Sequence, residues 1–334
     1  DIGGGPSGTT PGIRVGGWIS AGSDLDGNPI VAVSSDHADR DPGLAGRATE
    51  NLEVYVAHWN AGSWREYQGT VSGNGIGDPS GSAETAAIAM DRKGLPTVAW
   101  RQSGAAPGSS GIHLRSFDGA TWKELGGSAS GDGVASAARD PALSLDESGN
   151  PVLAWLQALP AGVGSTEVYV RRWNGSAWIE LGGSGSGDGI SKHGGRNLRS
   201  PSVAVDVAGL PVVTWSDATV SPERVFLRRW NGSAWIELAG SASGGGLGTM
   251  GTSSSSLAVD RSGNPNVSWV SADGSAMVSR WDGSTWLAEK VATNAIETRL
   301  VVDPNGQPVI AWRQAPPANE IRVLRWSGTA WADL

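Results

Sequence analysis

Residues 141 to 181 read PALSLDESGNPVLAWLQALPAGVGSTEVYVRRWNGSAWIEL, a stretch with four segments of strand-like composition. A tight turn at Asp146 to Pro151 separates the first two segments, and Asn174-Gly175-Ser176 separates the last two. Gly149 allows the positive φ of such a turn, proline is tolerated where a strand opens, and Asn-Gly is a strong hairpin signal. The stretch therefore predicts a four-stranded antiparallel sheet.

Both turn signatures recur six times along the chain. The Asp-x-x-Gly-x-Pro turn begins at Asp24, Asp91, Asp146, Asp206, Asp260 and Asp303. Two aromatic residues five positions apart follow at Trp59/Trp64, Phe117/Trp122, Trp173/Trp178, Trp230/Trp235, Trp281/Trp286 and Trp326/Trp331. Repeats of about 45 to 58 residues with four strands and no amphipathic helix are typical of β-propeller blades. We predict an all-β, six-bladed β-propeller of four-stranded antiparallel blades.

The repeats also predict the domain organisation. The six blades are expected at about 16–69, 84–127, 139–183, 199–240, 253–290 and 297–334, so that residues 16–334 form a single propeller. The preceding residues 1–15 are rich in Gly and Pro, a composition typical of a flexible lead. Within this lead, we expect Ile13 to Val15 to act as a latch strand beside the last blade.

Tryptophan is the dominant aromatic residue of the chain. Sixteen of its 17 Trp residues occupy repeat positions, whereas there are only two Phe and three Tyr. We interpret the repeated Trp side chains as packing residues, because each can bury about 150–250 Å². Stacking on a sugar is the alternative. Trp18 lies outside the repeat pattern, in the expected first strand, and is therefore a candidate ligand-binding residue.

One hairpin sequence, RRWNGSAWIEL, occurs identically at residues 171–181 and 228–238. With its V-D-x-x-G-x-P turns, the chain resembles the recently amplified β-propeller repeats of bacterial surface proteins. Residues 279–286, SRWDGSTW, are also similar to the Asp-box of sialidase-type propellers, although Asp282 and Gly283 are adjacent here and the Asp-box separates them by one residue. The resemblance implies a fold, and it implies no defined activity or ligand.

The composition limits the function classes. A formal net charge of −8 argues against a nucleic-acid partner, which needs clustered Lys and Arg. No apolar run of 18 residues is present, so we expect no membrane insertion. The absence of Cys excludes a disulfide framework and a thiolate metal site. Gly- and Ser-rich loops with only four Lys lead us to expect a secreted or cell-surface bacterial protein.

The long connections of the blades are the expected location of binding residues. In an up-and-down blade, the connections from the second to the third strand and from the fourth strand to the next blade lie on the same face, and variable loops often carry function. Gly240 to Gly246 exemplifies the alternative, a solvated coil that only bridges two sheets. Polar residues just beyond the second strands should line this face; they are Gln102, Gln157, Asp217 and Gln314, with Ser35 and Ser271. Their amides suit sugar hydroxyls, or else satisfy backbone groups at the strand ends.

Two charged clusters are further candidate sites. The segment DHADRD contributes Asp36, His37, Asp39 and Asp41, which suit a hard cation such as calcium, and we predict no other cofactor. The basic segment 192–199 contributes His193, Arg196 and Arg199, which suit a carboxylate or sulfate ligand. A solvated polar loop is the alternative for both clusters.

The sequence contains no convincing catalytic arrangement. Glycoside hydrolysis needs two carboxylates at one bond, and a sialidase-type site also needs an arginine cluster and a Tyr nucleophile. Tyr55 and Tyr169 occupy one equivalent strand position and are better explained by packing. We therefore predict a non-enzymatic scaffold that binds proteins, or assembles with itself, through the loop face. A multivalent lectin that binds glycans is the alternative, and a sialidase-like glycoside hydrolase is the third interpretation.

Overall fold

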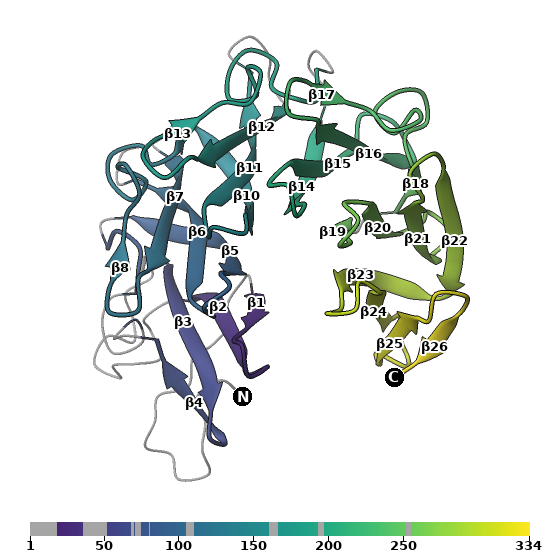
Figure 1. Cartoon of the computed structure of the whole chain (residues 1–334), viewed down its shortest axis with the longest axis horizontal. Coiled ribbons are helices and arrows are strands. Elements are labelled where there is room, and N and C mark those ends of the chain that lie inside the picture. The colour runs from purple at the N-terminus through teal and green to yellow at the C-terminus, as the bar shows by residue number, and fades with distance from the viewer. Residues whose placement is uncertain are drawn as a thin grey trace. The chain divides into compact units, whose positions relative to one another are not determined.

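The computed structural model describes residues 19–35, 52–67, 70, 75–79, 81–104, 110–159, 166–192, 197–251 and 255–334. None of these residues lies in a helix. The β-strands form six antiparallel sheets (Figure 1). The predicted fold class, an all-β six-bladed β-propeller of four-stranded blades, is confirmed. Two compact units divide the chain, 1–151 with 173–178 and 152–172 with 179–334.

The first three sheets follow chain order. Sheet 1 contains β1 (Ile19–Ser23), β2 (Pro29–Ser35), β3 (Glu53–Asn60) and β4 (Ser63–Glu66). Sheet 2 contains β5 (Ser82–Met90), β6 (Pro96–Ser103), β7 (Ser110–Phe117) and β8 (Trp122–Lys123), and the short β9 (Ala135–Ser136) also pairs with β7. Sheet 3 contains β10 (Ala138–Leu145), β11 (Pro151–Ala158), β12 (Thr166–Trp173) and β13 (Trp178–Ile179).

The last three sheets repeat this order. Sheet 4 contains β14 (Leu198–Val205), β15 (Pro211–Asp217), β16 (Glu223–Trp230) and β17 (Trp235–Ile236), and β18 (Gly248–Met250) also pairs with β16. Sheet 5 contains β19 (Ser256–Val259), β20 (Pro265–Val270), β21 (Ala276–Trp281) and β22 (Trp286–Ala292). Sheet 6 contains β23 (Ala295–Val302), β24 (Pro308–Gln314), β25 (Ile321–Trp326) and β26 (Trp331–Asp333).

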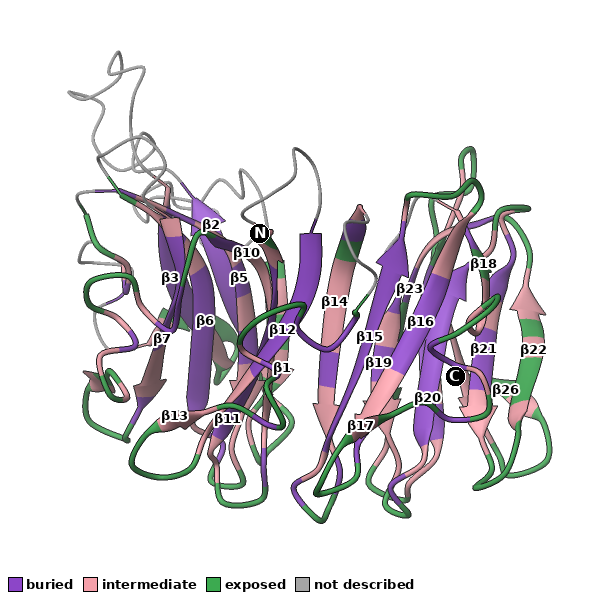
Figure 2. Ribbon diagram, turned by 90° about the horizontal axis from the view of Figure 1, so that it is seen from above, coloured by how far each residue is buried: buried purple, intermediate pink, exposed green. Residues whose placement is uncertain are grey.

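The second strand of each sheet carries much of the core. Figure 2 shows β6, β15 and β20 almost entirely buried. Their Trp100, Trp215 and Trp269 side chains are at most 2% exposed, and Val33 takes this position in β2. The packing role predicted for Trp therefore holds fully for these strands. In contrast, most of the paired Trp side chains of the outer hairpins are only half-buried.

The turn between the first two strands depends on its aspartate. Asp146 Oδ1 accepts hydrogen bonds of 2.9 Å from the amides of Ser148 and Asn150, and the Gly149 amide donates to the Asp146 carbonyl. Gly149 has φ 80°, which glycine adopts without steric cost. The equivalent aspartates of the other sheets, Asp24, Asp91, Asp206, Asp260 and Asp303, accept the same pair of amides. The Asp, Gly and Pro of this signature thus specify one turn geometry.

The outer hairpin places its two aromatic residues opposite each other. In sheet 4, Trp230 pairs with Trp235 across a four-residue loop, and their ring centroids are 5.8 Å apart. Asn231 Oδ1 holds the loop closed by accepting the amides of Ser233 and Ala234. Such a tilted aromatic pair adds about 0.5–1.5 kcal/mol beyond its burial.

The outer edge of the third strand is covered by a repeated glycine turn in sheets 1 to 4. In sheets 2 to 4 the fourth strand is only two residues long, so it leaves most of this edge without a strand partner. The connection that follows returns along the edge, where the Ile190 amide donates to the Val168 carbonyl at 2.8 Å. The equivalent bonds are Ile76 to Val54, Val134 to Ile112 and Leu247 to Val225. The described parts of these connections are therefore hydrogen-bonded turns: Gly240 to Gly246, for which a solvated coil was the alternative, leads back to the edge of β16, and residues 243–245 of it are exposed.

A hydroxyl group fixes the start of each glycine turn. Ser184 Oγ donates to the Val170 carbonyl at 2.7 Å and accepts the Leu181 amide at 3.0 Å. Ser128 and Ser241 make the same two bonds, and Thr70 Oγ1 donates to Val56. The turn thereby satisfies backbone groups that a longer fourth strand would otherwise pair, as β22 does in sheet 5.

The last glycine of the turn lies against the strand backbone. A Cβ atom on Gly189 would lie 2.1 Å from the Val168 carbonyl oxygen, and φ of Gly189 is 57°. Gly133 and Gly246 have the same close contact, at 2.3 and 2.2 Å. A Cβ atom on Gly187, two residues earlier, would meet no atom within 4 Å, although its φ is 55°. Gly187 thus isolates the cost of the backbone conformation from the cost of the contact.

We predict that Gly189→Ala lowers the free energy of unfolding by about 3 kcal/mol or more, because the new methyl group forces the turn away from β12. Gly187→Ala should lower it by only about 1 kcal/mol, the cost of a left-handed conformation for alanine. Urea unfolding followed by tryptophan fluorescence measures both values. Equal losses in the two variants would show that the close contact with Val168 is unimportant.

Candidate functional site

Several residues predicted from the sequence as ligands lie outside the described residues. They are Trp18, the calcium candidates Asp36, His37, Asp39 and Asp41, and the basic residues His193 and Arg196. The latch strand at Ile13 to Val15 is also outside them. These assignments stay predictions, as does the scaffold function of the loop face to which most of them belong.

The polar residues at the ends of the second strands are engaged within the protein. Gln102 Oε1 accepts Trp100 Nε1 at 2.8 Å and the Asp78 amide at 3.0 Å. Gln157 Oε1 accepts Trp155 Nε1 at 3.2 Å, and the buried Asp217 Oδ1 accepts the Thr219 amide at 2.9 Å. These side chains accept hydrogen bonds from indole and backbone donors of the protein, which favours the structural alternative over a sugar site.

The two remaining predicted residues are also held locally. Arg199 is exposed and lies 3.3 Å from Glu223 Oε1 of its own sheet. Gln314 ends β24 and is half-buried, and its backbone N–H donates to the Glu320 carbonyl at 2.8 Å. Neither residue belongs to the two arrangements that the sequence did not predict, one around Arg280 and Glu289 and the other around Glu53.

Neighbouring sheets are joined at the outer hairpins by a repeated contact. The indole nitrogen of the fourth-strand Trp donates to a leucine carbonyl of the preceding sheet, with a distance of 2.8 Å in three cases: Trp178 to Leu125, Trp235 to Leu181 and Trp286 to Leu238. In the first two of these junctions the partner tryptophan covers the glycine after that leucine: a Cβ atom on Gly126 would lie 2.7 Å from Trp173 Cζ3, and one on Gly182 would lie 2.8 Å from Trp230 Cζ3. We call this junction of two hairpins a seam.

The seam between sheets 5 and 6 is built differently. Glu289 stands three residues after Trp286, the position at which sheets 2 to 4 have leucine. Its side chain accepts Trp331 Nε1 at 2.8 Å through Oε2, and its Oε1 atom forms an ion pair with Arg280. The Arg280 guanidinium carbon lies 3.7 Å from the ring centroid of Trp326, a cation–π contact. Arg280, Glu289, Trp326 and Trp331 are here called the seam cluster.

Arg280 has a different environment from its counterparts in sheets 3 and 4. Arg172 donates to the Gly209 carbonyl at 3.1 Å, and Arg229 donates to Asp206 at 2.7 Å, both at the turn between the first two strands. Arg280 instead pairs with Glu289 and covers Trp326. The seam cluster is partly accessible, because the side chains of Arg280 and Glu289 are 16% and 34% exposed. It therefore combines two aromatic faces, one cation and one carboxylate at a solvent-accessible junction.

A second unusual group lies between sheets 1 and 2. Glu53 begins β3 and is 2% exposed, and its Oε2 atom has no hydrogen-bond partner among the described residues. Burial raises the pKa of this carboxyl to about 7, and the negative charge of Asp78 contributes to the increase. A buried carboxylate without a donor is unfavourable, so Glu53 needs an explanation other than packing.

His113 lies in the same part of sheet 2. It is 5% exposed, and its ring centroid is 6.0 Å from that of Trp100. Burial lowers the pKa of His113, because the charged imidazolium loses its hydration there. The equivalent residues Tyr169 and Phe226 stack on Trp155 and Trp215 at almost the same distance, 6.0 and 6.2 Å. This position therefore accepts an uncharged aromatic ring.

No protein-family profile matches the chain, and no curated protein matches its sequence. Its fold is similar to that of SapL1 lectin in complex with α-methyl fucoside, with a TM-score of 0.52 at 14% identity over 96% of both chains. It is also similar to a variant of the Aleuria aurantia lectin in complex with Fucα1-6GlcNAc, with a TM-score of 0.52 at 13% identity over 96% of this chain and 95% of that one. A Penicillium chrysogenum α-L-arabinanase complexed with arabinobiose gives 0.53 at 14% identity over 97% and 96%. At these identities the similarity establishes the propeller fold.

The described residues contain neither a membrane-spanning helix nor a cluster of metal-ligating side chains. None of these residues forms a helix long and apolar enough to cross a membrane. Within the same described part of the chain, no three His, Asp or Glu side chains come together as a metal-binding group. Among the described residues, the seam cluster and Glu53 are two arrangements that packing alone does not explain.

We predict that His113→Phe changes the pH dependence of stability. The folded-state pKa of His113 lies below its ordinary value of 6.5, so as the pH falls below 6.5 the unfolded chain binds a proton that the folded chain does not. The free energy of unfolding of the wild type therefore decreases as the pH falls below 6.5. The His113→Phe variant lacks this decrease because it has no imidazole at this position. Its stability should be within about 1 kcal/mol of the wild type at pH 8 and exceed it at pH 5. Urea unfolding at both pH values measures the difference, and parallel pH curves would contradict the prediction.

Proposed function

We propose that this propeller is a non-enzymatic, glycan-binding protein of the lectin type, and that the seam cluster is one of its sugar-binding sites. The observation that carries the proposal is the contact of Arg280 with Trp326 and Glu289 at a partly exposed junction. Indole faces suit the apolar C–H faces of sugar rings, and guanidinium and carboxylate groups suit adjacent hydroxyls. Small-ligand sites typically combine an aromatic surface with a small number of polar groups.

The chemistry of the cluster supports binding more than hydrolysis. Glycoside hydrolysis uses a pair of carboxylates that flank the bond, whereas the seam cluster contains one carboxylate, Glu289. That carboxylate is also committed to Arg280 and Trp331. The propeller lectins of similar fold are recorded in complex with fucosides, which supports a sugar ligand for this fold without specifying which sugar.

The competing proposal is the protein-binding scaffold. Measurement of glycan binding distinguishes the lectin from the scaffold. A glycan array probed with the full chain should show binding to a defined sugar, and calorimetric titration with that sugar should give the number of sites per chain. Several equal sites would support the multivalent form of the proposal. No response to any glycan would contradict it and leave protein binding as the better explanation.

We predict that Arg280→Ala weakens binding of the sugar found on the array by at least about tenfold, because the ligand loses both a charged donor and the ordered Trp326 face. Arg322→Ala is the matched control, since Arg322 is an exposed arginine of sheet 6, the sheet that also carries Trp326, and its partner Glu320 is equally exposed. The control should bind as the wild type does. Equal affinity in both variants, at unchanged thermal midpoints, would remove the seam cluster from the binding site.

A further inference from the structure

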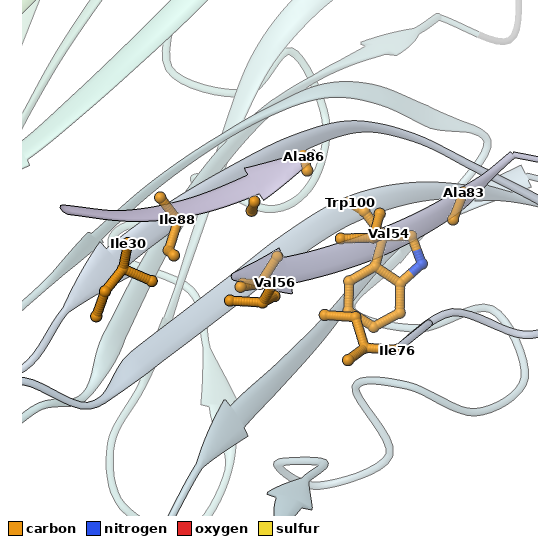
Figure 3. Packing of buried hydrophobic residues seen from close by; sticks show 10 residues of the cluster. Ile30, Val54, Val56, Ile76, Ala83, Ala86, Ile88 and Trp100 are labelled. Atoms are coloured by element: carbon orange, nitrogen blue, oxygen red, sulfur yellow. The ribbon is translucent and has the colours of Figure 1, made fainter. Parts of the chain in front are cut away.

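The Oε2 atom of Glu53 is covered by residues 75–78 and receives no hydrogen bond from the described residues. Three backbone amides of this segment donate elsewhere: Gly75 to Thr70, Ile76 to Val54 and Asp78 to Gln102. Figure 3 shows Ile76 packed beside Val54, Val56 and Trp100, so the segment is anchored in the core. The charge of Glu53 is therefore enclosed by a fixed backbone rather than by a mobile side chain.

Glycine allows this backbone to close over the carboxylate. A Cβ atom on Gly77 would lie 2.8 Å from Glu53 Oε2, and one on Gly75 would lie 3.2 Å from it. A larger residue at Gly77 would displace the carboxyl group. Because both Gly75 and Gly77 lack a side chain, neither can donate a side-chain hydrogen bond to Glu53. The nearest charged group of the segment, Asp78, has the same sign and raises the pKa of Glu53.

Sheet 3 has a buried glutamate at the equivalent position, and this glutamate has a hydrogen-bond donor. Glu167 occupies the position of Glu53, is fully buried, and accepts a hydrogen bond from Ser191 Oγ. In the glycine turn, Ser191 is followed by Lys192, whereas the equivalent residues of sheet 1 are Gly77 and Asp78. Sheet 1 therefore has Gly77 where sheet 3 has the hydroxyl donor Ser191, and the carboxylate of Asp78 where sheet 3 has the cation Lys192. This difference turns a satisfied buried acid into an acidic pair.

We propose that Glu53 and Asp78 bind a hard divalent cation, calcium or magnesium, at the outer edge of sheet 1. The cation supplies a positive charge at the turn that in sheet 3 contains Lys192, and it coordinates the Glu53 oxygen that no donor among the described residues reaches. Hard cations prefer carboxylate oxygens and bind through one or two of them, with water completing the coordination. Asp78 is exposed, which gives the ion and its water ligands a route from solvent. The proposal uses described residues rather than the calcium candidates Asp36, Asp39 and Asp41 predicted from the sequence, and it does not depend on glycan binding.

The test compares thermal midpoints of the full chain at pH 7.5 in excess chelator and in 10 mM CaCl₂ or MgCl₂. The wild type should melt about 2 to 5 °C higher with one of these salts, since a ligand of the native state stabilises it. Glu53→Gln should show no such rise. Glu167→Gln is the matched control, because it changes the equivalent buried acid of sheet 3, and its rise should equal that of the wild type.

A second variant keeps the test decisive if Glu53→Gln does not fold. Asp78→Lys places a cation on the protein at the exposed rim, so it should raise the midpoint in chelator and abolish the response to calcium and magnesium. No rise in the wild type with either salt would overturn the proposal and leave protonation as the means by which Glu53 is accommodated. An equal rise in wild type and Glu53→Gln would also overturn it, and loss of that rise in Asp36→Asn/Asp39→Asn/Asp41→Asn would move the ion to residues 36–41.

Discussion

Each blade must provide hydrogen-bond partners for the outer edge of its third strand, and much of the structure follows from how this is done. An exposed strand edge invites pairing with another chain. The glycine turns of sheets 1 to 4 supply the partners locally, through bonds such as Ile190 to Val168. They fix the positions of Ser184 and Gly189. In sheets 2 to 4 the leucine before the turn also gives the carbonyl that receives the indole of the next sheet, so the edge and the seam are parts of one arrangement there.

Sheet 5 shows what changes when the turn is replaced by a full strand. β22 pairs along β21, and Glu289 takes the place of the leucine. A carboxylate then accepts the indole of Trp331, and the same carboxylate draws Arg280 onto Trp326. A local change in how one edge is satisfied thus creates a charged and aromatic surface that the other described seams lack.

The sequence predicted the blades because their signals are local. A turn such as Asp146 to Pro151 is determined by its own Asp, Gly and Pro, and a hairpin by Asn231 and its flanking tryptophans. The role of Gly246 was not predictable in the same way, because it depends on a strand edge 21 residues earlier, at Val225. The unsatisfied oxygen of Glu53 and the orientation of Arg280 likewise depend on residues brought together only by folding.

The two copies of RRWNGSAWIEL have a consequence for assembly of the chain. Residues 171–181 and 228–238 belong to consecutive sheets and form hairpins of the same sequence. During folding, either copy presents the same edge to β11 and to β15, so the hairpins themselves carry no information about which sheet they should join. Correct pairing has to come from their flanks, such as Tyr169 on Trp155 and Phe226 on Trp215. Neighbouring repeats of high identity are prone to exchange of equivalent segments, and these two hairpins are where such misassembly would begin.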